Sequence, residues 1–165
     1  MQDPYNYSFD NNSGTYQFTT KNSIVYSVAF VEDNTLNSVS TSGKEFEDIY
    51  QIIIEKLTDE IEPFDSQVFL TIDLIIGDFF KNVKNALIYI CSDNKGKQIK
   101  RFNAFNRCYD NSKHKRYITK IDNVIKFEEI ASIIYTSFLY HNENPYVRYI
   151  LETFNEIEEV LNSEK

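Results

Sequence analysis

The sequence is poor in the residues that mark sharp turns or chemical reactivity. Its 165 residues include four glycines, three prolines, two cysteines, two histidines, one methionine and no tryptophan. With so little glycine and proline, most turn signals are missing, and element boundaries must be read from hydrophobic periodicity. Two cysteines are too few for a disulfide-stapled scaffold. We interpret Cys91 and Cys108 as small buried apolar residues.

Signals for export or membrane insertion are also missing. No stretch approaches the ~20 apolar residues of a membrane span. The start of the chain, Met1 to Tyr5, lacks the basic beginning and apolar run of a signal peptide. We therefore expect a cytoplasmic protein in a reducing compartment.

Motifs for catalysis or cofactor binding do not occur. The chain has no G-x-S-x-G or G-x-x-x-x-G-K-[ST] sequence, and no His, Cys, Asp and Glu set with zinc spacing. His114 stands between Lys113 and Lys115, whose charges disfavour a protonated imidazole. Asp73 and Asp78 are five positions apart, so they do not stack on one helix face. The sequence predicts no metal site and no cofactor.

The chain has enough hydrophobic and aromatic residues to form a core. Hydrophobic residues make up 42% and aromatic residues 15%, all of the latter Phe or Tyr, which argues against global disorder. The length suits one domain spanning residues 1–165.

The first part of the chain alternates apolar and polar residues with the period of a β-strand. This pattern recurs three times, and short polar turns separate the runs. It predicts an antiparallel meander of strands over residues 5–9, 15–20 and 24–31.

Residues 46–57 carry two conflicting signals. Phe46, Ile49 and Ile53 have helical spacing, and residues 42–45 could form a capping box. The β-branched run at 52–54 favours a sheet instead. We favour a strand over residues 49–56 and keep the helix as the alternative.

Two helices and a strand are predicted in the middle of the chain. A wide apolar stripe indicates a buried helix over residues 67–81, capped by Asp65 or Ser66. The apolar run at 86–91 predicts a central strand, and a second helical face recurs over 99–109. Core positions should include Ile72, Ile76, Phe79, Ile88, Ile90 and Phe105.

The remaining elements complete an α+β fold. We expect strands at 117–121 and 124–127 around a turn at Asp122 and Asn123, and a further strand within 130–140. Asn144 and Pro145 predict the start of a final helix with an acidic face. The predicted architecture is a single, mostly antiparallel sheet with one long buried helix and two further helices.

Charge is unevenly distributed along the chain, whose net charge is −8. Residues 95–126 hold ten Lys and Arg against two acids, a net of +8, whereas the other residues hold seven bases and 23 acids, a net of −16. Such segregation bears on partners rather than on fold. The bases of this window could simply pair with the acidic remainder, for example the last helix.

The alternative is an anion- or partner-binding surface. We predict a non-enzymatic protein-interaction module that docks through the basic segment 95–126 or through the acidic C-terminal helix. Nucleic acid is a weaker candidate, because the acidic remainder repels a polyanion. The predicted binding residues are Lys95, Lys97, Lys100, Arg101, Arg107, Lys115 and Arg116.

Several segments together resemble an uncharacterised bacterial family, typical of Bacteroidota, known only as a domain of unknown function. These are the Y-x-F pieces that end at 18–20, the segments 69–76 and 88–91, the following 96–98, residues 101–105 and the pair 144–145. The resemblance covers most of the chain and implies no activity.

The order of predicted elements is also similar to the latter part of the acyl-CoA N-acyltransferase fold. In that fold a glycine-rich turn at the start of the long helix holds the pyrophosphate of CoA. Here Leu70 and Ile72 occupy the matching small-residue positions. This resemblance implies an acyltransferase-like enzyme or a degenerate relative, in which the loop and helix at 93–109 carry the site and Tyr109 donates a proton.

Overall fold

A computed structural model describes residues 3–41, 43, 45–59, 64–91, 96, 98–127 and 132–163. For residues 39, 125–127, 132 and 157–163 it describes only the backbone. The fold is α+β, with one sheet of seven strands in the order β1-β2-β3-β4-β5-β7-β6. All neighbours in the sheet are antiparallel except β4 and β5.

The N-terminal meander is confirmed. β1 (Tyr7–Asp10), β2 (Thr15–Thr19) and β3 (Val25–Glu32) pair in sequence, as their alternation predicts. The ambiguous segment is a strand, β4 (Ile49–Lys56), which pairs with β3 along its length. Between β3 and β4 the chain forms a short helix, α1 (Thr35–Val39), whose Leu36 is fully buried.

The central elements also follow the predicted pattern. α2 (Ser66–Phe79) begins at Asp65, whose side chain accepts a hydrogen bond from the Gln67 amide. β5 (Ala86–Cys91) is followed by α3 (Gln98–Asn111) and a short 3-10 helix, η1 (Lys113–Arg116), capped by Ser112. Of the predicted core residues only Ile90 is half-buried, and the rest are buried.

The predicted turn at Asp122 and Asn123 is wrong. β6 (Ile118–Phe127) runs straight through both residues and pairs with β7 (Ser132–His141) along its whole length. The Asp122 side chain accepts a hydrogen bond from Ser137, and the Asn123 carbonyl accepts one from Thr136. These cross-strand contacts give two turn-forming residues a stable place inside a ladder.

The helices cover both faces of the sheet. Leu87 of β5 belongs to a core cluster with α2 and α3, whereas its neighbours Ala86 and Ile88 belong to a second cluster with α1 and α4 (Val147–Ser163). Because successive strand residues point to opposite faces, the two helix pairs lie on opposite sides. α4 is preceded by Asn144, whose side chain accepts from the Tyr146 amide. Among the described residues, no helix is long and apolar enough to span a membrane.

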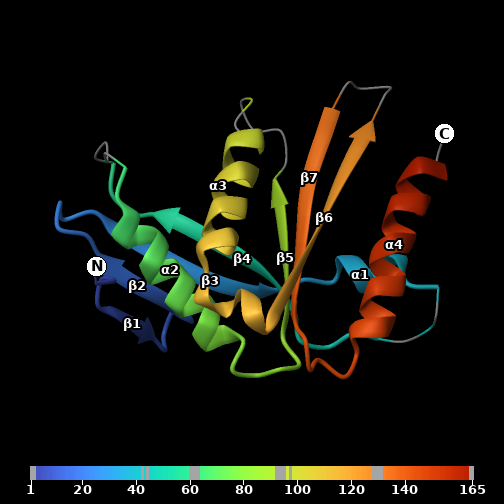
Figure 1. Ribbon diagram of the computed structural model, residues 1–165, viewed down its shortest axis with the longest axis horizontal. Coiled ribbons are helices and arrows are strands. Elements are labelled where there is room, and N and C mark those ends of the chain that lie inside the picture. Colours follow the sequence, from blue (N-terminus) through green and yellow to red (C-terminus); the bar gives the residue numbers. More distant parts are fainter. Residues whose placement is uncertain are drawn as a thin grey trace.

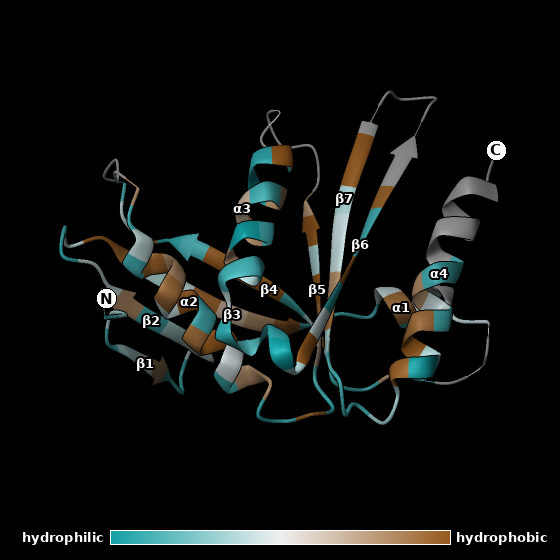
Figure 2. Ribbon diagram, viewed as in Figure 1, coloured by the Kyte–Doolittle hydropathy of each residue, from teal (hydrophilic) through white to brown (hydrophobic). Residues whose placement is uncertain are grey.

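β4 and β5 diverge almost as soon as they meet. Their parallel pairing covers three positions, from Ile49 opposite Ala86 to Gln51 opposite Ile88. Beyond these, the two strands run in different directions, with α2 and α3 beside the opening (Figure 1). β5 is hydrophobic along most of its length, and the visible side of α3 is largely hydrophilic (Figure 2). The side of α3 that faces the sheet is apolar instead, because Phe105 belongs to the core cluster.

Candidate functional site: a cleft between α2 and α3

Among the described residues, backbone groups of both β4 and β5 have no strand to pair with at the opening. The amides of Asp33 and Leu57 donate to the carbonyls of Ile49 and Val25, both at 2.8 Å, so the odd-numbered residues of β4 bond to β3. The backbone N–H and C=O groups of the even-numbered residues of β4 therefore point toward β5. Since the ladder with β5 ends at Gln51, the N–H and C=O of Ile54 have no strand to pair with in the described part of the chain.

The facing edge of β5 has the same property. The Ala86 amide donates to the Asp48 carbonyl at 2.8 Å, which places the even-numbered residues of β5 on the β4 side. Ile90 therefore directs its backbone N–H and C=O into the opening, beyond the last pair with β4. Two strand edges that face each other and have no partner in the described part of the chain form a place where an extended chain can add hydrogen bonds.

A hollow of about 320 Å³ lies above this opening. Its floor includes Ile54 and Tyr89, and its walls come from α2 and α3. A second hollow of about 310 Å³ lies alongside and shares the lining residues Phe69, Asp73, Ala104 and Cys108. The two hollows form one cleft between α2 and α3, which we call the α2–α3 cleft.

The predicted basic residues lie on the α3 side of this cleft. Lys100, Arg101 and Arg107 are exposed on α3, and no ion pair joins any of them to a carboxylate among the described residues. Arg101 lines the first hollow and Arg107 the second. Lys95 and Lys97 lie outside the described residues. The structure thus brings Arg101 and Arg107 together at one cleft.

The other predicted bases have different surroundings. Lys115 lines the first hollow, but its ammonium donates to the Asp110 carbonyl at 2.7 Å. Arg116 lies over the Tyr117 ring, 5.7 Å from its centroid. Lys120 is almost fully buried against Asp122, with its ammonium over the rings of Phe102 and Tyr109. The basic window is therefore not one continuous surface.

The described acidic side chains of α4 have partners outside the basic window. Glu152 pairs with Arg148 at 3.0 Å, and Glu156 accepts hydrogen bonds from Thr41. No described residue of α4 pairs with a base of 95–126. The structure does not describe the side chains of residues 157–163, so pairing between the rest of α4 and the basic window stays a prediction.

Tyr109 and Cys108 are the reactive side chains nearest the predicted site. The Tyr109 hydroxyl donates to the Ile118 carbonyl at 2.9 Å, and burial raises its pKa above the ordinary value. Burial, assisted by the Asp73 charge, raises the pKa of the Cys108 thiol to about 12. Cys108 is therefore a thiol at neutral pH, and a thiol is a poor nucleophile.

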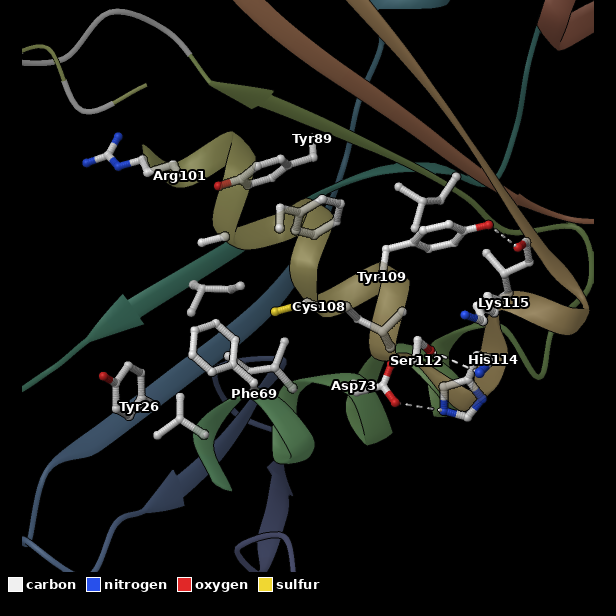
Figure 3. Close-up of a pocket in the computed structure, with 18 residues that line it drawn as sticks. Tyr26, Phe69, Asp73, Tyr89, Arg101, Cys108, Tyr109, Ser112, His114 and Lys115 are labelled. Carbon is white, nitrogen blue, oxygen red and sulfur yellow. Dashed lines mark hydrogen bonds and ion pairs between the residues drawn. The ribbon is translucent and has the colours of Figure 1, made fainter. Parts of the chain in front are cut away.

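The inner end of the first hollow holds a polar pair that the sequence did not suggest. His114 Nε2 lies 3.8 Å from Asp73 Oδ2, and both side chains line the hollow (Figure 3). Gly77, on the same helix as Asp73, allows the imidazole to approach α2. A glycine inside a predicted helix is the one sequence signal that indicates such a close approach.

Metal binding finds no support in these side chains. Within the described ranges, no three His, Cys, Asp or Glu residues are grouped so that they could hold an ion. The Asp73 and His114 pair lacks a further ligand, and Arg101 and Lys115 add positive charge to the same hollow.

Comparison with known protein families gives one match. Residues 64–156 match the Family of unknown function (DUF6169). The chain belongs to this family. The matched segment begins just before α2 and ends within α4, so the DUF6169 region contains both helices of the cleft but not β4. No curated protein and no solved structure matches the chain.

Proposed function

We propose that this DUF6169 protein is a non-enzymatic binding module that takes an extended, acidic segment of a partner protein into the α2–α3 cleft. The observation that carries the proposal is the pair of unpaired strand edges at Ile54 and Ile90. A segment inserted between them would gain main-chain hydrogen bonds from both sides. We further propose a bacterial, cytoplasmic protein, supported by the family resemblance of the sequence and by its two free cysteines.

The charge around the cleft favours an acidic partner. Arg101 and Arg107 line its two hollows and have no carboxylate partner within the described part of the chain. Guanidinium groups bind carboxylates through paired hydrogen bonds. The other predicted docking surface, the acidic face of α4, is less available, because Glu152 and Glu156 already have partners. We therefore favour the basic side of α3.

The side chains around the cleft favour binding over chemistry. The Tyr109 hydroxyl donates its hydrogen to the Ile118 carbonyl, and the raised pKa of Cys108 keeps its thiol protonated at neutral pH. The Ile54 side chain is 38% exposed at the edge of the cleft. A bound segment that covers it would gain the free energy of burying this apolar surface.

A display experiment tests the proposal. A library of random dodecapeptides is selected on the full chain, and the affinity of a selected peptide is measured by fluorescence polarisation. We expect acidic sequences, and we expect Ile54→Pro to weaken binding about tenfold, because proline lacks the edge N–H. Ile54→Ala, which keeps that N–H, should weaken binding less.

Charge reversal supplies a matched control. Arg101→Glu with Arg107→Glu alters two residues that line the cleft, whereas Lys113→Glu with Arg116→Glu makes the same change in charge at two residues of η1 that line neither hollow. We expect the first pair to abolish binding at low salt and the second to reduce it slightly. Equal losses from both pairs, or selected peptides without acidic residues, would contradict the proposal.

Acyl transfer is the second candidate, and the order of the elements along the chain favours it. A strand meander, a helix, a strand, a further helix and a hairpin follow one another as in the acyl-CoA N-acyltransferase fold. The pantetheine arm of CoA is also an extended chain with amide groups, so it could use the same strand edges. Against it, the Asp65 carboxylate already occupies the Gln67 amide at the start of α2, where a phosphate would bind.

Isothermal titration with acetyl-CoA separates the two candidates. We expect no heat and no thermal shift at millimolar ligand, because a carboxylate at the start of α2 repels a pyrophosphate. Saturable binding that Asp65→Asn strengthens would instead make acyl transfer the leading function.

A further inference from the structure

The second hollow of the α2–α3 cleft lies between facing stripes of the two helices. α2 contributes Phe69, Leu70 and Asp73, and α3 contributes Ala104, Arg107 and Cys108. On each helix these positions are three or four residues apart, so they share one face. Figure 3 shows Phe69 and Asp73 of α2 opposite Cys108 of α3. The volume of about 310 Å³ is within the range of small-molecule sites.

Most of the lining of this hollow is apolar, and part of it is exposed. The side chain of Phe64, just before α2, is 80% exposed, and that of Leu70 is 39% exposed. The ring of Phe64 lies against that of Phe69, with their centroids 5.5 Å apart. Ala104 and Cys108 are half-buried on the α3 side. Exposed aromatic and aliphatic side chains gathered around a hollow are typical of an interaction site.

The two charged side chains of the hollow favour an acid beside Arg107 and an apolar group inside. Arg107 is exposed, and no ion pair joins it to a carboxylate among the described residues. Asp73 lines both hollows, and its side chain is 19% exposed. A ligand carboxylate placed against Asp73 would meet a like charge at low solvent exposure, which costs free energy. The acid of a ligand therefore belongs at the Arg107 end.

We infer that the second hollow takes an aromatic side chain that stands next to an acidic residue in the bound segment. The ring packs against Phe64 and Leu70, and the acid pairs with the Arg107 guanidinium. An aromatic ring is favoured over an aliphatic chain, because a pair of rings gains free energy beyond the area that it buries. The ring belongs to the extended acidic segment of the proposed function, so the identity of the partner rests on that proposal.

A small molecule tests the hollow without using either strand edge. 3-Phenylpropanoate carries a ring and a carboxylate, and it is titrated into the ¹⁵N-labelled full chain at neutral pH. We expect it to shift the backbone amide signals of Leu70, Ala104 and Arg107 saturably. 3-Phenylpropan-1-ol should bind about threefold more weakly and 3-phenylpropan-1-amine about tenfold more weakly, because the first loses the ion pair and the second opposes Arg107. Propanoate, which has no ring to bury, should give no saturable shift.

Two leucines of α2 supply a matched pair of variants. Leu70 and Leu74 are both 39% exposed and stand one turn apart, but Leu74 lines neither hollow. Leu70→Ser should weaken the binding of 3-phenylpropanoate about fivefold, because an apolar contact is lost. Leu74→Ser should leave the affinity unchanged. Thermal unfolding checks that the two variants are equally stable.

Two bases of α3 supply the matching control of charge. Lys100 is exposed like Arg107 but lines neither hollow. Arg107→Gln should remove the preference for 3-phenylpropanoate over the alcohol and keep the affinity for the alcohol, because the ring still has its contacts. Lys100→Gln should keep the preference.

The results separate the hollow from the extended segment. Retained binding of 3-phenylpropanoate without any peptide binding would reject the segment and keep the hollow as a site for an aromatic acid. Peptide binding that Leu70→Ser leaves unchanged would reject the hollow and keep the segment.

Three other outcomes would overturn the inference. The first is equal affinity for all four probes, or no saturable shift with any of them. The second is an equal loss in Leu70→Ser and Leu74→Ser. The third is a dimer, measured by analytical ultracentrifugation, that Leu70→Ser dissociates, because the occupant would then be a second copy of this chain.

Discussion

The imidazole of His114 lies directly against the backbone of Gly77 in the last turn of α2. A Cβ atom at position 77 would be 2.3 Å from His114 Nε2 and 2.4 Å from its Cε1, well inside van der Waals contact. Asp73 is one turn earlier on the same helix, so glycine at 77 lets the ring reach the face that carries Asp73. This contact fixes the inner end of the α2–α3 cleft.

Gly77→Ala should destabilise the protein although alanine is the better helix former. The helix preference alone would stabilise α2 by about 1 kcal/mol, whereas forcing a methyl group into a packed contact costs about 1–3 kcal/mol. We expect a lower midpoint in chemical denaturation. In a His114→Ala background the contact is gone, and the same substitution should raise the midpoint. An increase in both backgrounds would show that the ring moves aside freely.

The contact between Tyr7 and Asp78 should make stability depend on pH. The Tyr7 hydroxyl donates to Asp78 at 2.5 Å, and the Lys81 ammonium bonds the same carboxyl at 2.7 Å. The hydrogen bond from Lys81, followed by that from Tyr7, lowers the pKa of Asp78 below the ordinary value. A carboxyl with a lowered folded pKa contributes stability above its unfolded pKa and loses it as pH falls through the folded pKa.

Tyr7→Phe removes one of these hydrogen bonds. We expect a loss of about 1–2 kcal/mol in the free energy of unfolding at pH 7. The difference from the parent should shrink as the pH falls below the ordinary aspartate pKa of about 4 and toward the lowered pKa of folded Asp78. Urea unfolding across this range measures it, with Tyr7→Phe/Asp78→Asn as control. A difference independent of pH would assign the loss to packing alone.

Asp122 should matter more for stability than its partner Lys120. Asp122 binds the Lys120 ammonium and accepts from Ser137, whose side chain is fully buried. Asp122→Ala leaves a buried hydroxyl and a largely buried ammonium without their acceptor, at a cost of about 2–4 kcal/mol. Lys120→Met keeps the buried stem and should cost less than about 1.5 kcal/mol. Thermal unfolding of both variants checks the order, and the reverse order would contradict the role given to Asp122.

Tyr109→Phe separates a structural role of this residue from a catalytic one. Its hydroxyl donates to the Ile118 carbonyl and ties α3 to the first residue of β6. We expect a loss of about 1 kcal/mol in stability and unchanged affinity for a selected peptide. A large loss of acyl-transfer activity with unchanged stability would restore Tyr109 as the proton donor.

The sequence alone determined the local elements of this protein. The alternation of apolar and polar residues predicted the meander, and the β-branched run predicted β4. The helical spacing of apolar residues after the Asp65 cap predicted α2. These signals succeed because each is carried by neighbours in the chain that must share one face. The sequence does not predict α1, because five residues are too few to show a helical period.

Only the tertiary structure decided how these elements build a cleft. Asp and Asn are common turn residues, so Asp122 and Asn123 predicted a turn. Hydrogen bonds from residues of β7 hold both of them in a strand instead. The divergence of β4 from β5, the unpaired edges at Ile54 and Ile90, and the meeting of Asp73 with His114 join residues far apart in the sequence. Strand pairing and helix packing are non-local, so no window of the sequence contains the contacts that place these groups together.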